Sequence, residues 1–147
     1  MVASSKDSEK QDSMNHSTEV SYEGSCHCRP VGFSTRLPSP LPHLTVISCN
    51  CSYCHIADSL LAFVDDMEIH QGTESLKEYR FGSHTIQIFF CGICGANVYN
   101  KSVNPKFRFG QCAINMRLLH GIDLGTVEVS KGDGKNIHLP PLEEDPL

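Results

Sequence analysis

Hydrophobic and polar residues alternate over short stretches along most of this 147-residue chain. Ile86, Ile88 and Phe90 are two residues apart, so their side chains share one face of an extended strand. The continuous apolar run at 60–64 indicates a buried strand. The pattern as a whole predicts short strands at Val20–Gly24, Val31–Phe33, 43–48, 60–64, Ile69–His70, 85–90, Val98–Tyr99, 107–113 and 126–129.

Glycine and proline separate these strands. Pro38, Pro40 and Pro42 predict a loop, because proline cannot sit in a central strand. Gln71-Gly72 is a turn signal, and the one helix that the pattern favours is short, at 114–120. Many short strands with this punctuation indicate an all-β fold.

The length and the polar ends predict one domain with two tails. Residues 1–18 carry almost no large apolar side chains, so we expect a disordered tail there, a zinc-binding β domain at 19–140 and a C-terminal tail at 141–147. The polar start of the chain has no apolar segment of a secretory signal, which predicts a cytoplasmic location. Cysteines in such a compartment are expected to bind metal rather than to form disulfides.

Charge and hydropathy restrict the partners. The formal net charge is −5, with 12 basic against 17 acidic residues, so a basic field for nucleic acid is missing. No apolar run approaches the roughly 20 residues that span a bilayer. We therefore expect neither nucleic acid nor a membrane as a partner, and the oligomeric state is left open.

The cysteines carry the strongest chemical signal. Seven of the eight fall into three tight groups, which are Cys26 and Cys28, then Cys49, Cys51 and Cys54, then Cys91 and Cys94. A structural zinc takes four protein ligands, whereas a catalytic zinc keeps three and an open position. Seven thiolates therefore divide into four and three, which predicts two Zn²⁺ per chain, one structural and one catalytic.

Two groupings of these ligands are possible. In the first, Cys26, Cys28, Cys91 and Cys94 form a closed site, because residues two apart on a strand point the same way and a Cys-x-x-Cys turn followed by glycine is a metal knuckle. In the second, the two Cys-x-x-Cys pairs, 51/54 and 91/94, form a zinc ribbon. The first leaves Cys49, Cys51 and Cys54 as a local three-sulfur site that can accept water or substrate.

The remaining candidates are weaker. Cys112 stands alone in a strand-like stretch and is expected to be a buried small hydrophobe. His27 and His55 lie beside the cysteines and are expected to be solvated, although either could support a ligand.

Several segments resemble one family. Its motifs are matched by Gly24-Ser25-Cys26-His27-Cys28, Cys49-Asn50-Cys51-Ser52-Tyr53-Cys54, Phe90-Cys91-Gly92-Ile93-Cys94-Gly95, Leu76-Lys77-Glu78-Tyr79-Arg80-Phe81 and Asn115-Met116-Arg117 with Gly121-Ile122-Asp123. Together they resemble the glutathione-dependent formaldehyde-activating enzymes, a family that also contains centromere protein V. The likeness extends over about residues 20 to 137.

The resemblance implies a β-tent-like fold of several short antiparallel sheets. It also implies that Cys26, Cys28, Cys91 and Cys94 hold a structural zinc. The catalytic zinc would then be held by Cys49, Cys51 and Cys54. The implied activity is that of a carbon–sulfur lyase on an S-hydroxymethylglutathione-like adduct.

Such a lyase needs further groups. A proton shuttle is required, and Tyr53, His55 and Asp58 are nearest to the three-sulfur site in sequence. Glutathione has two carboxylates, for which the candidate partners are Arg80, Lys106, Arg108 and Arg117. Two other functions stay open: a non-catalytic zinc module that binds a protein, and a biosynthetic enzyme that acts on a glutathionylated intermediate.

Overall fold

The computed structural model describes residues 18–39 and 44–139, which form two β-sheets. The smaller sheet has the order β1-β2-β5, with β1 at Thr18–Ser25, β2 at Gly32–Ser39 and β5 at Met67–Gln71. The all-β prediction is confirmed. The predicted tails, apart from Thr18, and the positions of Pro40 and Pro42 lie outside the described residues.

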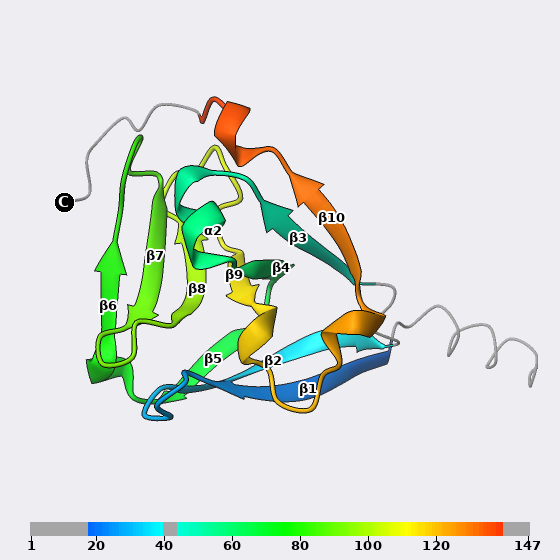
Figure 1. Cartoon of the computed structure of the whole chain (residues 1–147). Helices are drawn as coiled ribbons and strands as arrows, with labels where there is room; N and C mark the ends of the chain where they lie inside the picture. Colours follow the sequence, from blue (N-terminus) through cyan, green and yellow to red (C-terminus); the bar gives the residue numbers. More distant parts are fainter. Residues whose placement is uncertain (1–17, 40–43, 140–147) are drawn as a thin grey trace, which may run out of the picture.

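The larger sheet has seven strands and lies above the smaller one in Figure 1. Its order is β10-β3-β4-β9-β8-β7-β6. The bounds are β3 Thr45–Cys49, β4 Leu60–Val64, β6 Leu76–Tyr79, β7 Ile86–Cys91, β8 Asn97–Ser102, β9 Cys112–Asn115 and β10 Glu128–Gly132. The resemblance implied antiparallel sheets, and the pairing of β10 with β3 is instead parallel. That pair joins segments about 80 residues apart, so neither hairpin nor turn signals could reveal its direction.

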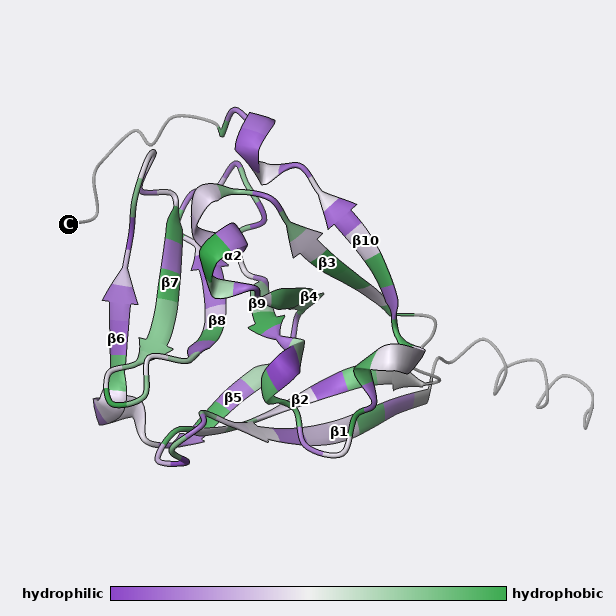
Figure 2. Ribbon diagram, viewed as in Figure 1, coloured by the Kyte–Doolittle hydropathy of each residue, from purple (hydrophilic) through white to green (hydrophobic). Residues whose placement is uncertain are grey.

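One face of the large sheet packs on the small sheet. Val46, Ala62 and Ile114 on this face are fully buried and share a core with Phe33 and Leu37 of β2. Figure 2 shows hydrophobic residues on β3, β4, β7 and β9, and hydrophilic residues along β6 and at the turn after β10. Burial of this apolar face is what holds the two sheets together.

The other face of the large sheet is concave and carries α2, a six-residue helix at Ser52–Ala57 (Figure 1). Strand register places the side chains of Leu61, Ala113, Asn100 and Ile88 on this face. Ala113 is paired with Asn100 and Asn100 with Ile88, and paired residues share a face. Leu61 is paired with the residue two positions after Ala113, so its side chain lies on the same face. Rows on adjacent strands thus make a continuous floor beneath α2.

Two predicted elements are wrong. Residues 114–120 do not form a helix, since Ile114 and Asn115 belong to β9 and only Met116–Leu118 makes a 3₁₀ turn. The strand predicted at 107–113 begins at Cys112 instead. Arg108 and Gly110 adopt left-handed backbone conformations, with φ of 44° and 90°, and a strand cannot continue through them.

Two further points correct the loop and helix predictions. Pro38 lies in β2 rather than in a loop, opposite Glu19 of β1. It is tolerated because β5 pairs only with residues 32–35, so β2 has an unpaired edge at Pro38. The helix α2 was not expected at all. Among the described residues, no helix is long and apolar enough to cross a membrane.

Candidate metal centres and the adjoining pocket

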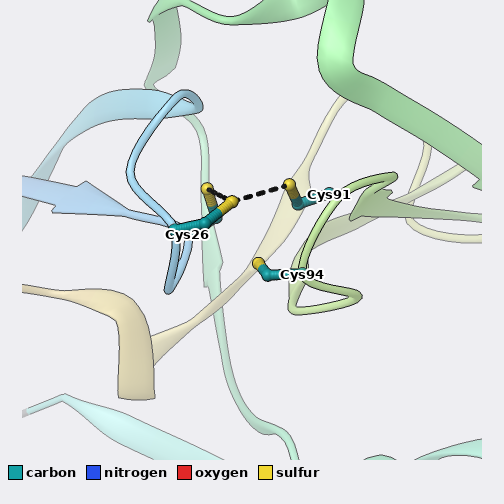
Figure 3. Close-up of side chains that lie close together, drawn as sticks. Cys26, Cys91 and Cys94 are labelled. Carbon is teal, nitrogen blue, oxygen red and sulfur yellow. Dashed lines mark hydrogen bonds between the residues drawn. The ribbon is translucent and has the colours of Figure 1, made fainter.

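Cys26, Cys28, Cys91 and Cys94 come together where the two sheets meet. Their four sulfur atoms all lie within 4.8 Å of one another. Cys28 Sγ is 3.8 Å from Cys26 Sγ and 3.6 Å from Cys91 Sγ, and the four side chains converge from two separate turns (Figure 3). Four converging thiols are the donor set of a closed structural zinc site. We call this group the four-cysteine cluster.

Backbone N–H groups from the two turns help to orient these sulfur atoms. The N–H of Val31 points at Cys26 Sγ at 3.4 Å, and the N–H of Ile93 points at Cys91 Sγ at the same distance. Gly95 has a left-handed backbone with φ of 81°, which closes the turn after Cys94. Backbone N–H groups around sulfur stabilise thiolates and hold metal ligands in place.

The thiols of the cluster do not ionise equally. Burial disfavours the thiolate of Cys94, but hydrogen bonds from the backbone of Ala96 and Cys28 and from the thiols of Cys28 and Cys91 outweigh it and lower the pKa of Cys94 to about 6. Removal of water around its sulfur, together with hydrogen bonds to Cys91, Cys94 and Cys26, raises the pKa of Cys28 to about 12. Because the four sulfurs lie so close together, a negative charge on one thiolate disfavours ionisation of the others. A bound cation would offset this repulsion.

Cys49, Cys51 and Cys54 form a second group, which we call the claw. Their sulfur atoms also lie within 4.8 Å of one another, and the described residues add no His, Asp, Glu or further Cys to the group. The backbone N–H of Cys51 points at Cys49 Sγ at 3.4 Å, and that of Cys54 points at Cys51 Sγ at 3.3 Å. Because Cys51 and Cys54 group with Cys49, the zinc-ribbon alternative does not describe this fold.

The claw explains why α2 exists. Cys51 caps the helix by accepting the N–H of Cys54 through its side chain, and Asp58 ends it in a left-handed conformation. Burial, followed by the hydrogen bond and charge of Cys51, raises the pKa of the Cys54 thiol. Three partly buried sulfurs fit a soft divalent metal such as zinc and leave room for an additional ligand.

A pocket of about 800 Å³ opens beside the claw, between α2 and the concave face of the large sheet. Its floor is apolar and is formed by Ile47, Leu61, Phe63, Ile86, Ile88 and Ala113. The claw is in contact with this floor, because Cys54 forms one buried cluster with Leu61 and Ala113, and Cys49 and Cys51 pack against that cluster. A ligand bound to the claw would therefore lie against apolar side chains.

Positive charges surround the pocket. Arg108 and Lys135 line it, against a single lining carboxylate among the described residues, that of Asp133. Lys101 also borders the pocket, but it pairs with Cys112, so its side chain lies on the opposite face of the sheet. The Arg108 guanidinium carbon lies 3.8 Å from the centroid of the Phe63 ring, a cation–π contact that holds this charge over the floor. The electrostatic balance suits an anionic ligand.

The structure places only one of the four predicted carboxylate partners at the pocket. Arg108 lines the pocket, whereas Arg80, Lys106 and Arg117 do not. Arg80 is bound to Glu78, and Arg117 donates to the carboxylate and the backbone oxygen of Asp58. Lys135, which lines the pocket, was missed, because no local signal marks it.

Of the three residues predicted as proton shuttles, the structure places one at the pocket. Tyr53 lines the pocket, while His55 and Asp58 are exposed and do not. Burial, and then the nearby thiols of Cys54 and Cys51, raises the pKa of Tyr53. Cys112 is half-buried on the opposite face of the sheet and its pKa is raised by burial, and His27 is exposed.

A buried amide network lies under one side of the pocket. Ser59 Oγ donates to Asn97 Oδ1 at 2.9 Å, and Asn97 Nδ2 donates to Asn100 Oδ1 at 2.9 Å and to the Phe89 carbonyl at 3.1 Å. Asn100 is 6% exposed and lines the pocket. Since its oxygen is used by Asn97 and no group in the described part of the chain accepts from its nitrogen, Asn100 Nδ2 is left as a donor for a ligand.

A family model identifies the chain. The model for glutathione-dependent formaldehyde-activating enzyme matches residues 21–114. The chain belongs to this family. Both cysteine groups lie inside the match, whereas β10 and the turn that follows it, which form one wall of the pocket, lie beyond it.

The solved structures include a protein with a similar fold. The crystal structure of a Rhodobacter sphaeroides protein, a structural genomics target, is 25% identical to this chain with a TM-score of 0.60. The alignment covers 74% of this chain and 99% of that one. The two proteins therefore share a fold over nearly all of the bacterial protein and about three quarters of this chain.

Proposed function

We propose that this protein is a zinc-dependent carbon–sulfur lyase acting on a glutathione adduct similar to S-hydroxymethylglutathione. Family membership supports a glutathione-linked activity. The observation that carries the proposal is the position of the claw, whose three sulfurs lie at a pocket large enough for a peptide-sized ligand.

The two cysteine groups have different proposed roles. The four-cysteine cluster joins the β1–β2 turn to the end of β7, so a zinc held by Cys26, Cys28, Cys91 and Cys94 would tie the two sheets together. A second zinc would be held by Cys49, Cys51 and Cys54. When bound there, zinc would keep a substrate sulfur as thiolate near neutral pH.

The reaction breaks one carbon–sulfur bond. In a thiohemiacetal the hydroxyl on the carbon next to sulfur gives up its proton as the carbonyl forms, and the bonding electrons leave with sulfur to give glutathione and an aldehyde. The reverse reaction joins the same two molecules. No oxidant or reductant is needed.

The chain supplies binding and proton positions for this step. Arg108 and Lys135 are suited to the two glutathione carboxylates. The Tyr53 hydroxyl lies in the same pocket and can donate or accept a hydrogen bond at the adduct oxygen. The apolar floor excludes water from the carbon–sulfur bond. Unpaired thiols and a glutathione substrate both suit a reducing compartment, so we place the protein in the cytoplasm.

The test combines zinc counting with turnover. We expect two zinc ions per wild-type chain, and one in Cys49→Ser. Cys51→Ser should lose more than about 100-fold in turnover of S-hydroxymethylglutathione, because it removes a metal ligand. Cys112→Ser, a thiol on the opposite face of the sheet, is the matched control and should keep both zinc and turnover.

Each alternative has its own outcome. Full activity and two zinc ions in Cys51→Ser would refute the proposed mechanism. Two bound zinc ions without turnover of any glutathione adduct would favour the non-catalytic module. Turnover restricted to a larger glutathionylated intermediate would favour the biosynthetic role.

A further inference from the structure

The floor of the pocket does not match glutathione itself. Glutathione consists of two carboxylates, an ammonium group and amides, and a formaldehyde adduct adds only a hydroxymethyl group. The floor presents six apolar side chains in the pocket that the claw borders: Ile47, Leu61, Phe63, Ile86, Ile88 and Ala113. Apolar surface of this extent beside the reacting sulfur gains binding energy only from an apolar group on the ligand.

Aromatic rings form one side of the same pocket. Tyr53 and Phe81 both line it, with ring centroids 6.3 Å apart and planes inclined by 29°. Tyr79 continues the row, 5.9 Å from Phe81 at 18°, and is 49% exposed. Nearly parallel rings that are open on one side offer a flat surface on which another ring can stack.

The polar groups supply partners for the rest of an adduct. Arg108, which lies over the Phe63 ring, and Lys135 can take the two glutathione carboxylates. Asn100 Nδ2 is held in place by the amide network and can donate to an oxygen on the ligand. An adduct with a peptide, one hydroxyl oxygen and an apolar ring would therefore find a partner for each part.

We infer that the preferred substrate is a glutathione thiohemiacetal of an aromatic aldehyde, in which the ring lies between the apolar floor and the Tyr53–Phe81 wall. This inference rests on the proposed lyase activity and specifies its substrate class. Atoms balance as before: the carbon–sulfur bond breaks, the hydroxyl loses its proton, sulfur keeps the electron pair, and the products are glutathione and the aromatic aldehyde.

Binding tests the inference independently of turnover. S-benzylglutathione and S-methylglutathione are stable thioethers with the same peptide, and their affinities for the wild-type protein can be compared by calorimetry. We expect the benzyl compound to bind at least about 10-fold more tightly, because its ring is buried on the floor. Equal affinities would overturn the inference.

Turnover gives the second arm. The glutathione adduct of benzaldehyde should have a kcat/KM at least about 10-fold above that of the formaldehyde adduct. Phe81→Leu and Phe81→Ala should reduce the ratio of kcat/KM for the benzaldehyde adduct to kcat/KM for the formaldehyde adduct. The matched control is Phe109→Ala, since Phe109 is 63% exposed and does not line the pocket.

The outcomes separate the two proposals. The formaldehyde adduct could be turned over with no preference for S-benzylglutathione in binding or for the benzaldehyde adduct in turnover. That result would overturn the aromatic substrate class but would be compatible with the proposed lyase activity. Tighter binding of S-benzylglutathione with no turnover of any adduct would support the ligand class and refute the lyase. A preference unaffected by both Phe81 variants would overturn the assigned ring site.

Discussion

Gly134 packs directly against the sulfur of Cys49. A Cβ atom on Gly134 would overlap Cys49 Sγ and would lie 3.2 Å from Cys51 Cβ. The turn is held there by Asn50, whose Oδ1 accepts from the Lys135 N–H at 2.9 Å and whose Nδ2 donates to Asp133 Oδ1 at 2.8 Å. A segment more than 80 residues away in sequence thus touches the claw and forms part of the pocket wall.

Gly134→Ala should reduce metal binding at the claw. The added methyl group must displace Cys49 Sγ or the turn, because neither backbone nor sulfur can give way without moving the claw. We expect zinc content to fall from two ions per chain towards one. Gly125→Ala is the control: Gly125 also lies in a three-residue 3₁₀ helix, and its nearest contact would be the side chain of Asp123 at 3.2 Å. Two tightly held zinc ions in Gly134→Ala would contradict the expected clash.

Asn97→Ala should lower the free energy of unfolding by about 2–3 kcal/mol, because it leaves Ser59 Oγ and Asn100 Oδ1 buried without their partner. Urea unfolding monitored by circular dichroism measures the change. Asn136→Ala removes an amide of the same kind from an exposed position and should change stability by less than about 0.5 kcal/mol. A change as small for Asn97→Ala would mean that the network does not support the pocket floor.

Glu78 should make the fold sensitive to acid. Burial opposes ionisation of Glu78, but hydrogen bonds from Arg80 and Gln87 outweigh it and lower the pKa below the ordinary value of 4.5. A carboxylate whose pKa is lower in the folded state stabilises the fold fully above the unfolded pKa, and this contribution is lost as pH falls through the folded pKa.

Glu78→Gln tests that contribution. At pH 7 it should reduce the free energy of unfolding by about 1 kcal/mol, and the difference from wild type should shrink towards pH 3.5. Glu128→Gln, at an exposed position, corrects for the effect of acid on the cysteines. A Glu78→Gln difference that stays constant between pH 7 and pH 3.5 would show that the ion pair is not the cause.

A chelator should remove the two proposed zinc ions in order. The claw offers three sulfurs at an open pocket, whereas the cluster offers four, two of them fully buried. The first equivalent should therefore leave quickly with little change in Tm, and the second slowly with a drop of several degrees. Zinc release followed by a colorimetric indicator, with Tm measured at each stage, checks the order. Simultaneous release would contradict the division into open and closed sites.

Parts of the fold could be read directly from local pattern. The run at 60–64 and the alternation of Ile86 and Ile88 predict β4 and most of β7, and both strands are present. Alternation works here because the two faces of a strand meet different surroundings. The same rule failed at 107–113, where Arg108 and Gly110 turn the chain although the residues are apolar enough for a strand.

Helix α2 shows a different limit. The segment Ser52–Ala57 is too short for a hydrophobic period and would not be stable alone. It forms because Cys51 caps it and because Cys54 is buried against Leu61 and Ala113 of the large sheet. Neither condition can be recognised before the sheet is known.

From the sequence alone came the all-β class and the grouping of seven cysteines into four and three, since both depend on residue type and spacing over a few positions. Only the tertiary structure decided that β10 runs parallel to β3, that Gly134 reaches Cys49, and that Arg108 and Lys135 share one pocket. These relations join segments tens of residues apart. Their cause is the burial of the large sheet on the small one, which no local pattern contains.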